Sequence, residues 1–221
     1  MRVMLSKNNV DAYAIISMCW RWIDLDLISK LKQRRSYREF ESEAFDIQIL
    51  VDAIEAAKYS PSGANKQPWT FCIVKDPSIK KTIREHAETS ELKFHQTISP
   101  SWKSDLVPLK VTSSKPFLEQ APYLIVIYKH IFQFDEQGNH VNVYYPDISV
   151  GIATGMLIAV LTDLGLDILT YTPPDLQFLS DILQRPKNEK PYLILVCGKG
   201  SKSYKLPQIS KKTNEEVIRI Y

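Results

Sequence analysis

The sequence predicts a domain that combines a central sheet with helices, of the α+β or α/β class. Short apolar runs at 123–128, 168–171 and 192–196 are typical of central strands, and helical patterns alternate with them. The chain has 221 residues, enough for one medium domain with a sizeable core or for two small ones. No internal repeat, low-complexity tract or interdomain linker divides it, so we expect one main domain.

The first predicted element is a helix over 9–33. Four apolar residues form a stripe on it: Leu25, Leu27, Ile28 and Leu31. Its segment 13–23 is the candidate for an export signal, but it lacks a small-residue cleavage site and charges interrupt it. A membrane span needs about 20 apolar residues, which this segment does not supply. We therefore expect a helical extension that packs on a partner, a cytoplasmic protein, and no membrane contact.

The middle of the chain predicts a helix, a strand and a second helix in turn. Residues 46–58 form an amphipathic helix, 70–74 form a short buried strand, and 78–96 return to helix. The pattern weakens over 97–114, which is rich in Ser, Thr and Pro. A mobile or ligand-ordered segment is the expectation there.

The segment 148–164 is apolar almost all the way round, so we expect a helix buried on every side. Gly151 and Gly155 lie on one face of this helix and permit close contact with another helix. A central core helix and a subunit interface explain this pattern equally well.

Charge and cysteine usage exclude several classes of partner. The net charge is +3 and the basic residues are spread out, so no nucleic-acid footprint is present. The three cysteines, Cys19, Cys72 and Cys197, are far apart and lack a C-x-x-C spacing. This argues against a disulfide framework or a zinc site and indicates a reducing compartment. The four histidines have no metal-ligand spacing either, so we expect no metal.

Two short runs carry the functional signal. Arg34, Arg35 and Arg38 place three guanidinium groups within five residues, a density suited to a phosphate dianion. The run 61–69 is a loop of small and hydrogen-bonding residues, where backbone amides can approach a flat polar ligand. Each run alone is more often a solvated surface or an ordinary loop. In combination they resemble the flavin-binding signature of the nitroreductase superfamily, which implies bound FMN.

The resemblance extends from Leu31 to the C-terminus and is strongest to the iodotyrosine deiodinase branch. The shared stretches lie at 34–38, 61–64, 68–71, 115–122, 144–150, 170–173 and 185–190. The resemblance implies an α+β nitroreductase-like sandwich, with a central mixed sheet flanked by helices, that works as an intertwined homodimer with FMN at the interface. Residues 31–221 would form this domain and 1–30 a helical extension that packs in the dimer.

The resemblance also implies a set of cofactor-binding residues. Those at the FMN phosphate and ribityl chain are Arg34, Arg35, Ser36 and Arg38, and those at one edge of the flavin ring are Pro61, Ser62 and Gly63. Thr170, Tyr171 and Thr172 would run beside the ring, with the Thr172 hydroxyl near flavin N5 as the catalytic group. Lys211 matches a family arginine at the phosphate, and it keeps the charge but loses the bidentate geometry.

On the substrate side, the resemblance implies that Glu91, His95 and Lys115 hold an amino-acid zwitterion, with Ala64 nearby. Glu91 and His95 are spaced i, i+4, so both can project from one helix face. By themselves they would be an ordinary exposed helical pair, and Lys115 a surface lysine. His95 replaces a family tyrosine and keeps a planar hydrogen-bonding side chain, whereas a shift of one residue would put Phe94 there instead.

The leading hypothesis is an FMN-dependent reductase of a small aromatic amino acid or phenol, and specifically a reductive dehalogenase of a halotyrosine-like substrate. A hydroxyl such as that of Thr172, donating to N5, would favour stepwise one-electron transfers. The electron donor would be NAD(P)H or a small redox protein. The alternatives are a general NAD(P)H-dependent nitroreductase or quinone reductase, a flavin- or ligand-binding protein without turnover, and a scaffold without cofactor.

Overall fold

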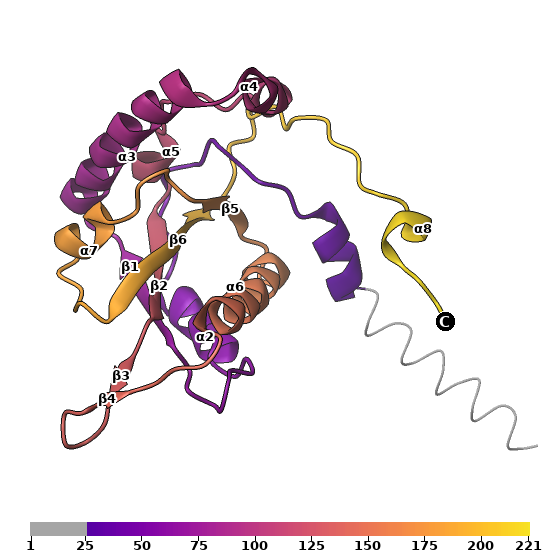
Figure 1. Ribbon diagram of the computed structural model, residues 1–221. Coiled ribbons are helices and arrows are strands. Elements are labelled where there is room, and N and C mark those ends of the chain that lie inside the picture. Colours follow the sequence, from indigo (N-terminus) through magenta and orange to yellow (C-terminus); the bar gives the residue numbers. More distant parts are fainter. Residues whose placement is uncertain (1–25) are drawn as a thin grey trace, which may run out of the picture.

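A computed structural model describes residues 26–221, and its centre is a four-stranded sheet (Figure 1). Its strands, in spatial order, are β1 (Trp69–Val74), β2 (Tyr123–His130), β6 (Glu189–Gly198) and β5 (Asp167–Tyr171). The predicted strands are confirmed. Leu25, Cys19 and most of the predicted N-terminal extension lie outside the described residues.

Neighbouring strands of this sheet all pair antiparallel. Val74 at the end of β1 faces Leu124 at the start of β2, because the intervening helices return the chain to the same end of the sheet. A mixed sheet also contains parallel pairing. Among the described residues, the parallel pairing is a single bridge between Ser36 and Ile168.

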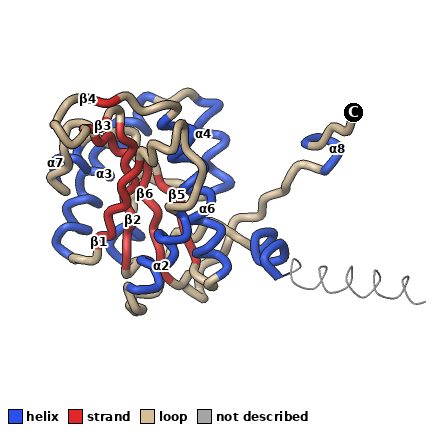
Figure 2. Tube along the Cα trace, turned by 90° about the horizontal axis from the view of Figure 1, so that it is seen from below, coloured by secondary structure: helices blue, strands red, loops and turns tan. Residues whose placement is uncertain are grey.

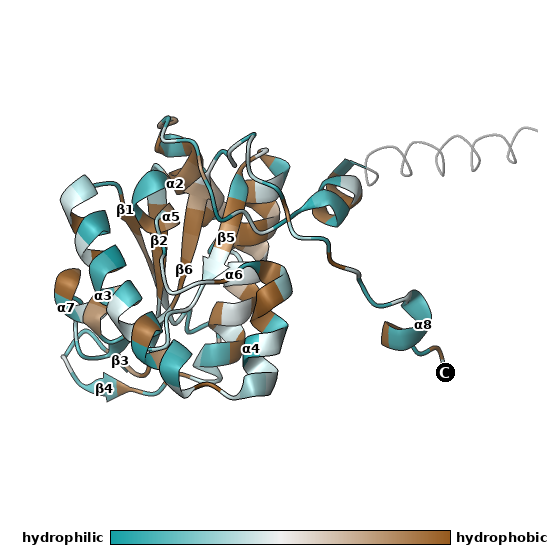
Figure 3. Ribbon diagram, turned by 90° about the horizontal axis from the view of Figure 1, so that it is seen from above, coloured by the Kyte–Doolittle hydropathy of each residue, from teal (hydrophilic) through white to brown (hydrophobic). Residues whose placement is uncertain are grey.

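Helices cover both faces of the sheet (Figure 1). On one face lie α3 (Pro77–Thr97), α5 (Phe117–Gln120) and α7 (Phe178–Ile182), and on the other α2 (Gln48–Ala57) and α6 (Pro146–Asp163). Successive strand residues point to opposite faces, so Leu124 packs in the α3 layer while Ile125 packs against α2 and α6. Figure 3 shows the apolar strands at the centre and the more hydrophilic α3 at one side.

The segment after α3 contains a helix that the weak sequence pattern over 97–114 did not predict. It contains α4 (Pro100–Leu106) and a 3-10 turn, η1 (Val107–Leu109). The Ser99 hydroxyl accepts a hydrogen bond from the Trp102 amide at 3.2 Å, and Pro100 occupies the first helical turn. A serine cap followed by proline is a helix start signal that outweighs the weak periodicity of this segment.

Helix α6 is not buried on every side, contrary to expectation. Val150, Ala153 and Leu157 are fully buried against the sheet, whereas 62% of Ile148 and 42% of Ile152 are exposed. Among the described residues α6 is the one helix whose length and composition suit a membrane span. Since 39% of its residues are buried inside the protein, packing on the sheet accounts for only part of its apolar character.

Both ends of the described chain leave the body of the protein (Figure 2). Residues 26–33 are helical, and their apolar residues Leu27, Ile28 and Leu31 are exposed. The C-terminal segment runs out to the short helix α8 (Asn214–Val217) and exposes Ile218. A small hairpin of β3 (Gln133–Phe134) and β4 (His140–Val141), which was not predicted, projects from the end of β2.

The stretch 185–190 anchors one end of the sheet. Arg185 donates to both oxygens of buried Glu189, at 2.7 and 2.9 Å, and Thr70 donates to it at 2.8 Å. Burial alone would raise the pKa of Glu189, but these hydrogen bonds and the Arg185 charge hold it below its usual range. The stretch 185–190 therefore links β1 to β6, because Thr70 lies on β1 and Glu189 on β6.

The sheet supplies the core, so a cavity in β2 should destabilise the protein strongly. We expect Leu124→Ala to lower the free energy of unfolding by about 2–5 kcal/mol, because Leu124 is fully buried. Leu92→Ala, on a leucine that is 54% exposed, should change it by less than about 0.5 kcal/mol. Urea denaturation measures both, and equal losses would contradict this assignment of the core.

Candidate active site

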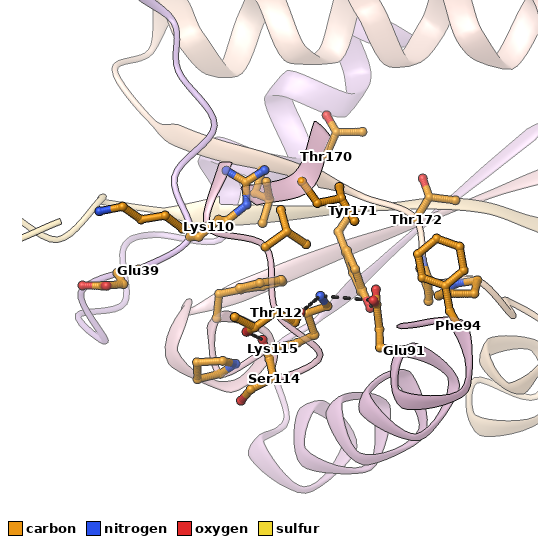
Figure 4. A pocket seen from close by; sticks show the side chains of 18 of the residues that line it. Glu39, Glu91, Phe94, Lys110, Thr112, Ser114, Lys115, Thr170, Tyr171 and Thr172 are labelled. Atoms are coloured by element: carbon orange, nitrogen blue, oxygen red, sulfur yellow. Dashed lines mark hydrogen bonds and ion pairs between the residues drawn. The ribbon is translucent and has the colours of Figure 1, made fainter. Parts of the chain in front are cut away.

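A cavity of about 620 Å³ opens where α3, the segment 106–117 and the end of β5 meet (Figure 4). Six residues predicted from the sequence line it: Arg38, Glu91, Lys115, Thr170, Tyr171 and Thr172. The structure therefore brings together predicted cofactor-binding and substrate-binding residues from four parts of the chain. We call Glu91, His95 and Lys115 the clamp.

Helix α3 positions two of the clamp residues. Asp76 caps its first turn by accepting from the amides of Ser78 and Ile79. Glu91 and His95 then lie one turn apart, and His95 Nε2 is 3.5 Å from Glu91 Oε2. Glu91 is only 6% exposed, which an ordinary surface pair would not be.

Lys115 approaches Glu91 from the loop that precedes α5. Its ammonium lies 3.3 Å from Glu91 Oε2 and donates to the Thr112 carbonyl, and the residue is 3% exposed. Glu88 holds the loop by accepting from the Lys115 amide at 2.6 Å. Arg84 in turn donates to Glu88 at 2.7 Å. Burial lowers the pKa of Lys115, and the Glu91 carboxylate opposes that shift.

The end of β5 presents different side chains to its two faces. Tyr171 points toward α3 and donates its hydroxyl to Glu91 Oε1 at 3.0 Å, whereas Thr170 and Thr172 point away (Figure 4). Both threonines are exposed. The Tyr171 side chain therefore reaches the clamp, and the place of residues 170–172 beside the flavin ring stays a prediction. The alternation of side chains along the predicted strand 168–171 could have indicated that residues 170 and 171 point to opposite faces.

Sequence reasoning missed an aromatic wall of the cavity. Phe94 and Trp102 pack edge to face with ring centroids 4.9 Å apart, and both line the cavity together with Leu106 and Val111. Phe94 thus borders the cavity while its neighbour His95 contacts Glu91. Phe94 and His95, the two candidates for the position of the family tyrosine, therefore have different surroundings: Phe94 lines the cavity and His95 faces Glu91. The wall was missed because 97–114 was not predicted to be helical.

The arginine cluster is divided between two cavities. Arg38 borders the clamp cavity, whereas Arg34 and Arg35 line a smaller one of about 300 Å³ beside the start of β5. Arg35 also donates to the Pro207 carbonyl, and Ser36 pairs with Ile168. No carboxylate among the described residues forms an ion pair with any of the three guanidiniums.

The remaining predicted residues lie elsewhere on the subunit. The loop containing Pro61, Ser62, Gly63 and Ala64 follows α2, and Gly63 pairs with Tyr144 just before α6. A Cβ at Gly63 would come within 2.5 Å of the Tyr144 carbonyl oxygen, so glycine is required for this approach. Lys211 is exposed on the C-terminal segment. None of these residues lines the clamp cavity.

These residues fit a planar cofactor that carries a phosphate. Arginines without a carboxylate partner suit a phosphate, and the exposed Thr170 and Thr172 line the same cavity as Arg38. The described residues contain no group of three or more His, Cys, Asp or Glu side chains that could hold a metal ion. The site therefore matches FMN better than a metal centre.

Comparison with known proteins agrees with this site. The model of the nitroreductase family matches residues 31–199, and the chain belongs to that family. It is 40% identical over 192 residues to the iodotyrosine deiodinase of Haliscomenobacter hydrossis, which covers 86% of each chain. It is 36% identical over 198 residues to that of Nematostella vectensis, covering 87% of this chain and 74% of that one.

A solved structure shows the same relationship. The crystal structure of oxidized iodotyrosine deiodinase bound to FMN and 3-iodo-L-tyrosine superposes with a TM-score of 0.77. The match has 30% sequence identity and covers 88% of this chain and 98% of that one. The predicted family, its deiodinase branch and the nitroreductase-like fold are confirmed.

The buried clamp predicts a pH-dependent loss of stability in Glu91→Gln. Without the carboxylate, Lys115 keeps its charge in a buried site, so we expect a loss of about 3 kcal/mol at pH 7. The pKa of Lys115 in the folded protein then falls further below 10.5, so as pH rises the folded chain loses the Lys115 proton before the unfolded chain does. Stability of the variant rises with pH wherever the unfolded chain binds more protons than the folded one. The deficit should therefore shrink toward pH 10.

Chemical denaturation between pH 7 and pH 10 measures this deficit. Glu85→Gln is the matched control, since Glu85 lies on the same helix with its side chain 53% exposed. It should have little effect at any pH. A Glu91→Gln deficit that stays constant across the range would show that Lys115 is not charged and buried as described.

Proposed function

We propose that this protein is an FMN-dependent oxidoreductase that removes halide reductively from a halotyrosine-like amino acid. The observation that carries the proposal is the buried pair of Glu91 and Lys115, 3.3 Å apart at the edge of the cavity. One negative and one positive group in one pocket match an amino-acid zwitterion. The relatives named iodotyrosine deiodinase, and the related structure with FMN and 3-iodo-L-tyrosine, support the substrate class.

In this proposal substrate binding exchanges one ion pair for two. Lys115 receives the substrate carboxylate and Glu91 receives its ammonium, so each clamp residue gives up the other for a substrate charge. The phenol ring then lies toward the end of β5, and Phe94 and Trp102 exclude water from it. The aromatic wall thus supplies the enclosure that desolvated redox chemistry requires.

FMN, when bound, supplies the electrons and the electron-accepting ring for the reaction. The guanidiniums of Arg34, Arg35 and Arg38 are assigned to its phosphate and ribityl chain. The Thr172 hydroxyl, exposed at the end of β5, is assigned to a hydrogen bond with flavin N5. Ser36, Thr170 and Lys211 keep their predicted cofactor roles, and Ala64 its predicted place on the substrate side.

The protein is proposed to work as an intertwined homodimer. The glycine loop lies in the α2 and α6 layer, away from the clamp in the α3 layer, so one subunit does not gather the whole predicted set. Ile148 and Ile152 leave an apolar strip exposed on α6. Both ends of the described chain extend from the body, where a second copy can hold them (Figure 2). A dimer brings the loop of one subunit to the clamp of the other.

The electron donor and the location of the protein stay predictions. NAD(P)H or a small redox protein is proposed to reduce the flavin. A cytoplasmic location is consistent with Cys72 and Cys197, which are free thiols in the structure. Residues 1–30 are proposed to act as an extension that packs in the dimer.

Halide release from the FMN-loaded protein tests the activity. With dithionite as reductant, we expect stoichiometric iodide from 3-iodo-L-tyrosine, and much slower reduction of nitroaromatics with NADPH. Lys115→Ala should weaken 3-iodo-L-tyrosine binding roughly 30-fold or more, measured by quenching of flavin fluorescence. Lys110→Ala is the control, because Lys110 borders the same cavity outside the clamp. Nitroaromatic turnover without halotyrosine binding would favour a general nitroreductase instead.

The dimer is tested by placing a charge on α6. Ile152→Asp should yield a monomer that has lost FMN, because a charge cannot be buried unpaired in an apolar interface. Leu92→Asp, on an exposed position of α3, should stay dimeric and yellow. Light scattering and flavin absorbance report the two properties. A wild-type monomer with one FMN per chain would refute the shared site.

A further inference from the structure

We propose that Tyr171 is a positioning residue that orients Glu91 for the substrate ammonium. The inference rests on the proposed function and specifies how that site recognises the amino group. Tyr171 and Glu91 come from different elements, β5 and α3, and meet at the edge of the cavity (Figure 4). Their contact joins the strand that borders the cofactor side to the helix that carries the clamp.

The contact is short and enclosed. The Tyr171 hydroxyl donates to Glu91 Oε1 at 3.0 Å, and the two residues are 8% and 6% exposed. The Tyr171 ring packs edge to face on Phe117, with centroids 5.4 Å apart. A ring held in this way on a strand has little freedom to turn, so the hydroxyl is a fixed reference for the carboxylate.

The two oxygens of Glu91 have different partners. Oε1 accepts from Tyr171, whereas Oε2 faces Lys115 at 3.3 Å and His95 at 3.5 Å. When Lys115 turns to a substrate carboxylate, Oε2 becomes available to the ammonium while Oε1 keeps its bond to Tyr171. Tyr171 is therefore the permanent partner of Glu91 and Lys115 the exchangeable one. This division keeps the carboxylate in place through the exchange.

The hydroxyl remains a donor across the working pH range. Burial, and next the nearby Glu91 charge, raise the pKa of Tyr171 far above its ordinary value. The same ring also lies 5.7 Å from the Lys115 ammonium, within the range of a cation–π contact. Phenylalanine at this position keeps the ring and its contacts but removes the bond to Glu91.

Tyr171→Phe in the FMN-loaded protein is the test, with two ligands that differ in one group. For 3-iodo-L-tyrosine we expect binding about tenfold weaker, because a hydrogen bond to a charged group is lost. For 3-(4-hydroxy-3-iodophenyl)propionate, which lacks the ammonium, binding should be unchanged. In turnover, KM for 3-iodo-L-tyrosine should rise while kcat changes little. Equal weakening for both ligands, or none for either, would overturn the proposal.

Tyr128→Phe is the matched control for the loss of a buried hydroxyl. Tyr128 is fully buried in the same core cluster and donates to the Leu179 carbonyl at 2.9 Å, outside the clamp. It should lower the unfolding temperature without changing either affinity. If Tyr171→Phe behaves like this control, its role is structural only and the proposal fails.

A double-mutant cycle shows whether Tyr171 acts through Glu91. On a Glu91→Gln background, Tyr171→Phe should weaken 3-iodo-L-tyrosine binding less than twofold further. A full tenfold loss on that background would contradict positioning. Failure of the wild-type protein to bind 3-iodo-L-tyrosine at all would instead remove the proposed function, so the two failures are distinguishable.

Discussion

The ion pair between Glu91 and Lys115 is the interaction on which the rest of the site depends. Both groups are nearly inaccessible to solvent, and a buried charge is tolerated only when it is paired and hydrogen-bonded. The surroundings meet this requirement: Tyr171 donates to Glu91, and Glu88 holds the Lys115 backbone. The pocket thus holds one positive and one negative group 3.3 Å apart. In the proposed function, a zwitterionic ligand pairs its carboxylate with the positive group and its ammonium with the negative one.

The strand β5 gives the site its two sides. It is an edge strand, so its last residues pair with β6 alone among the strands of this sheet and also line the cavity. The alternation of the strand sends Tyr171 into the α3 layer and leaves Thr170 and Thr172 on the other side. A single short strand therefore serves both the clamp and the proposed cofactor position, which ties the placement of one to the other.

The arrangement of the described chain supports the proposed homodimer. The glycine loop beside Tyr144 and the clamp around Glu91 lie in layers on opposite faces of the sheet. The exposed isoleucines of α6 and the extended C-terminal segment provide surface that a single copy does not use. An interface between two copies would cover these exposed apolar side chains.

The sequence by itself determined the order of the main elements, the family and the composition of the clamp. Apolar periodicity located α2, α3, β2, β5 and β6, because burial imposes these periods on any chain. Sequence alone predicted an α6 buried on every side, did not find α4, and did not show that the Tyr171 side chain reaches Glu91. Those outcomes depend on which surfaces meet in space. The bond from Tyr171 to Glu91 spans 80 positions, and only the folded sheet brings these residues together.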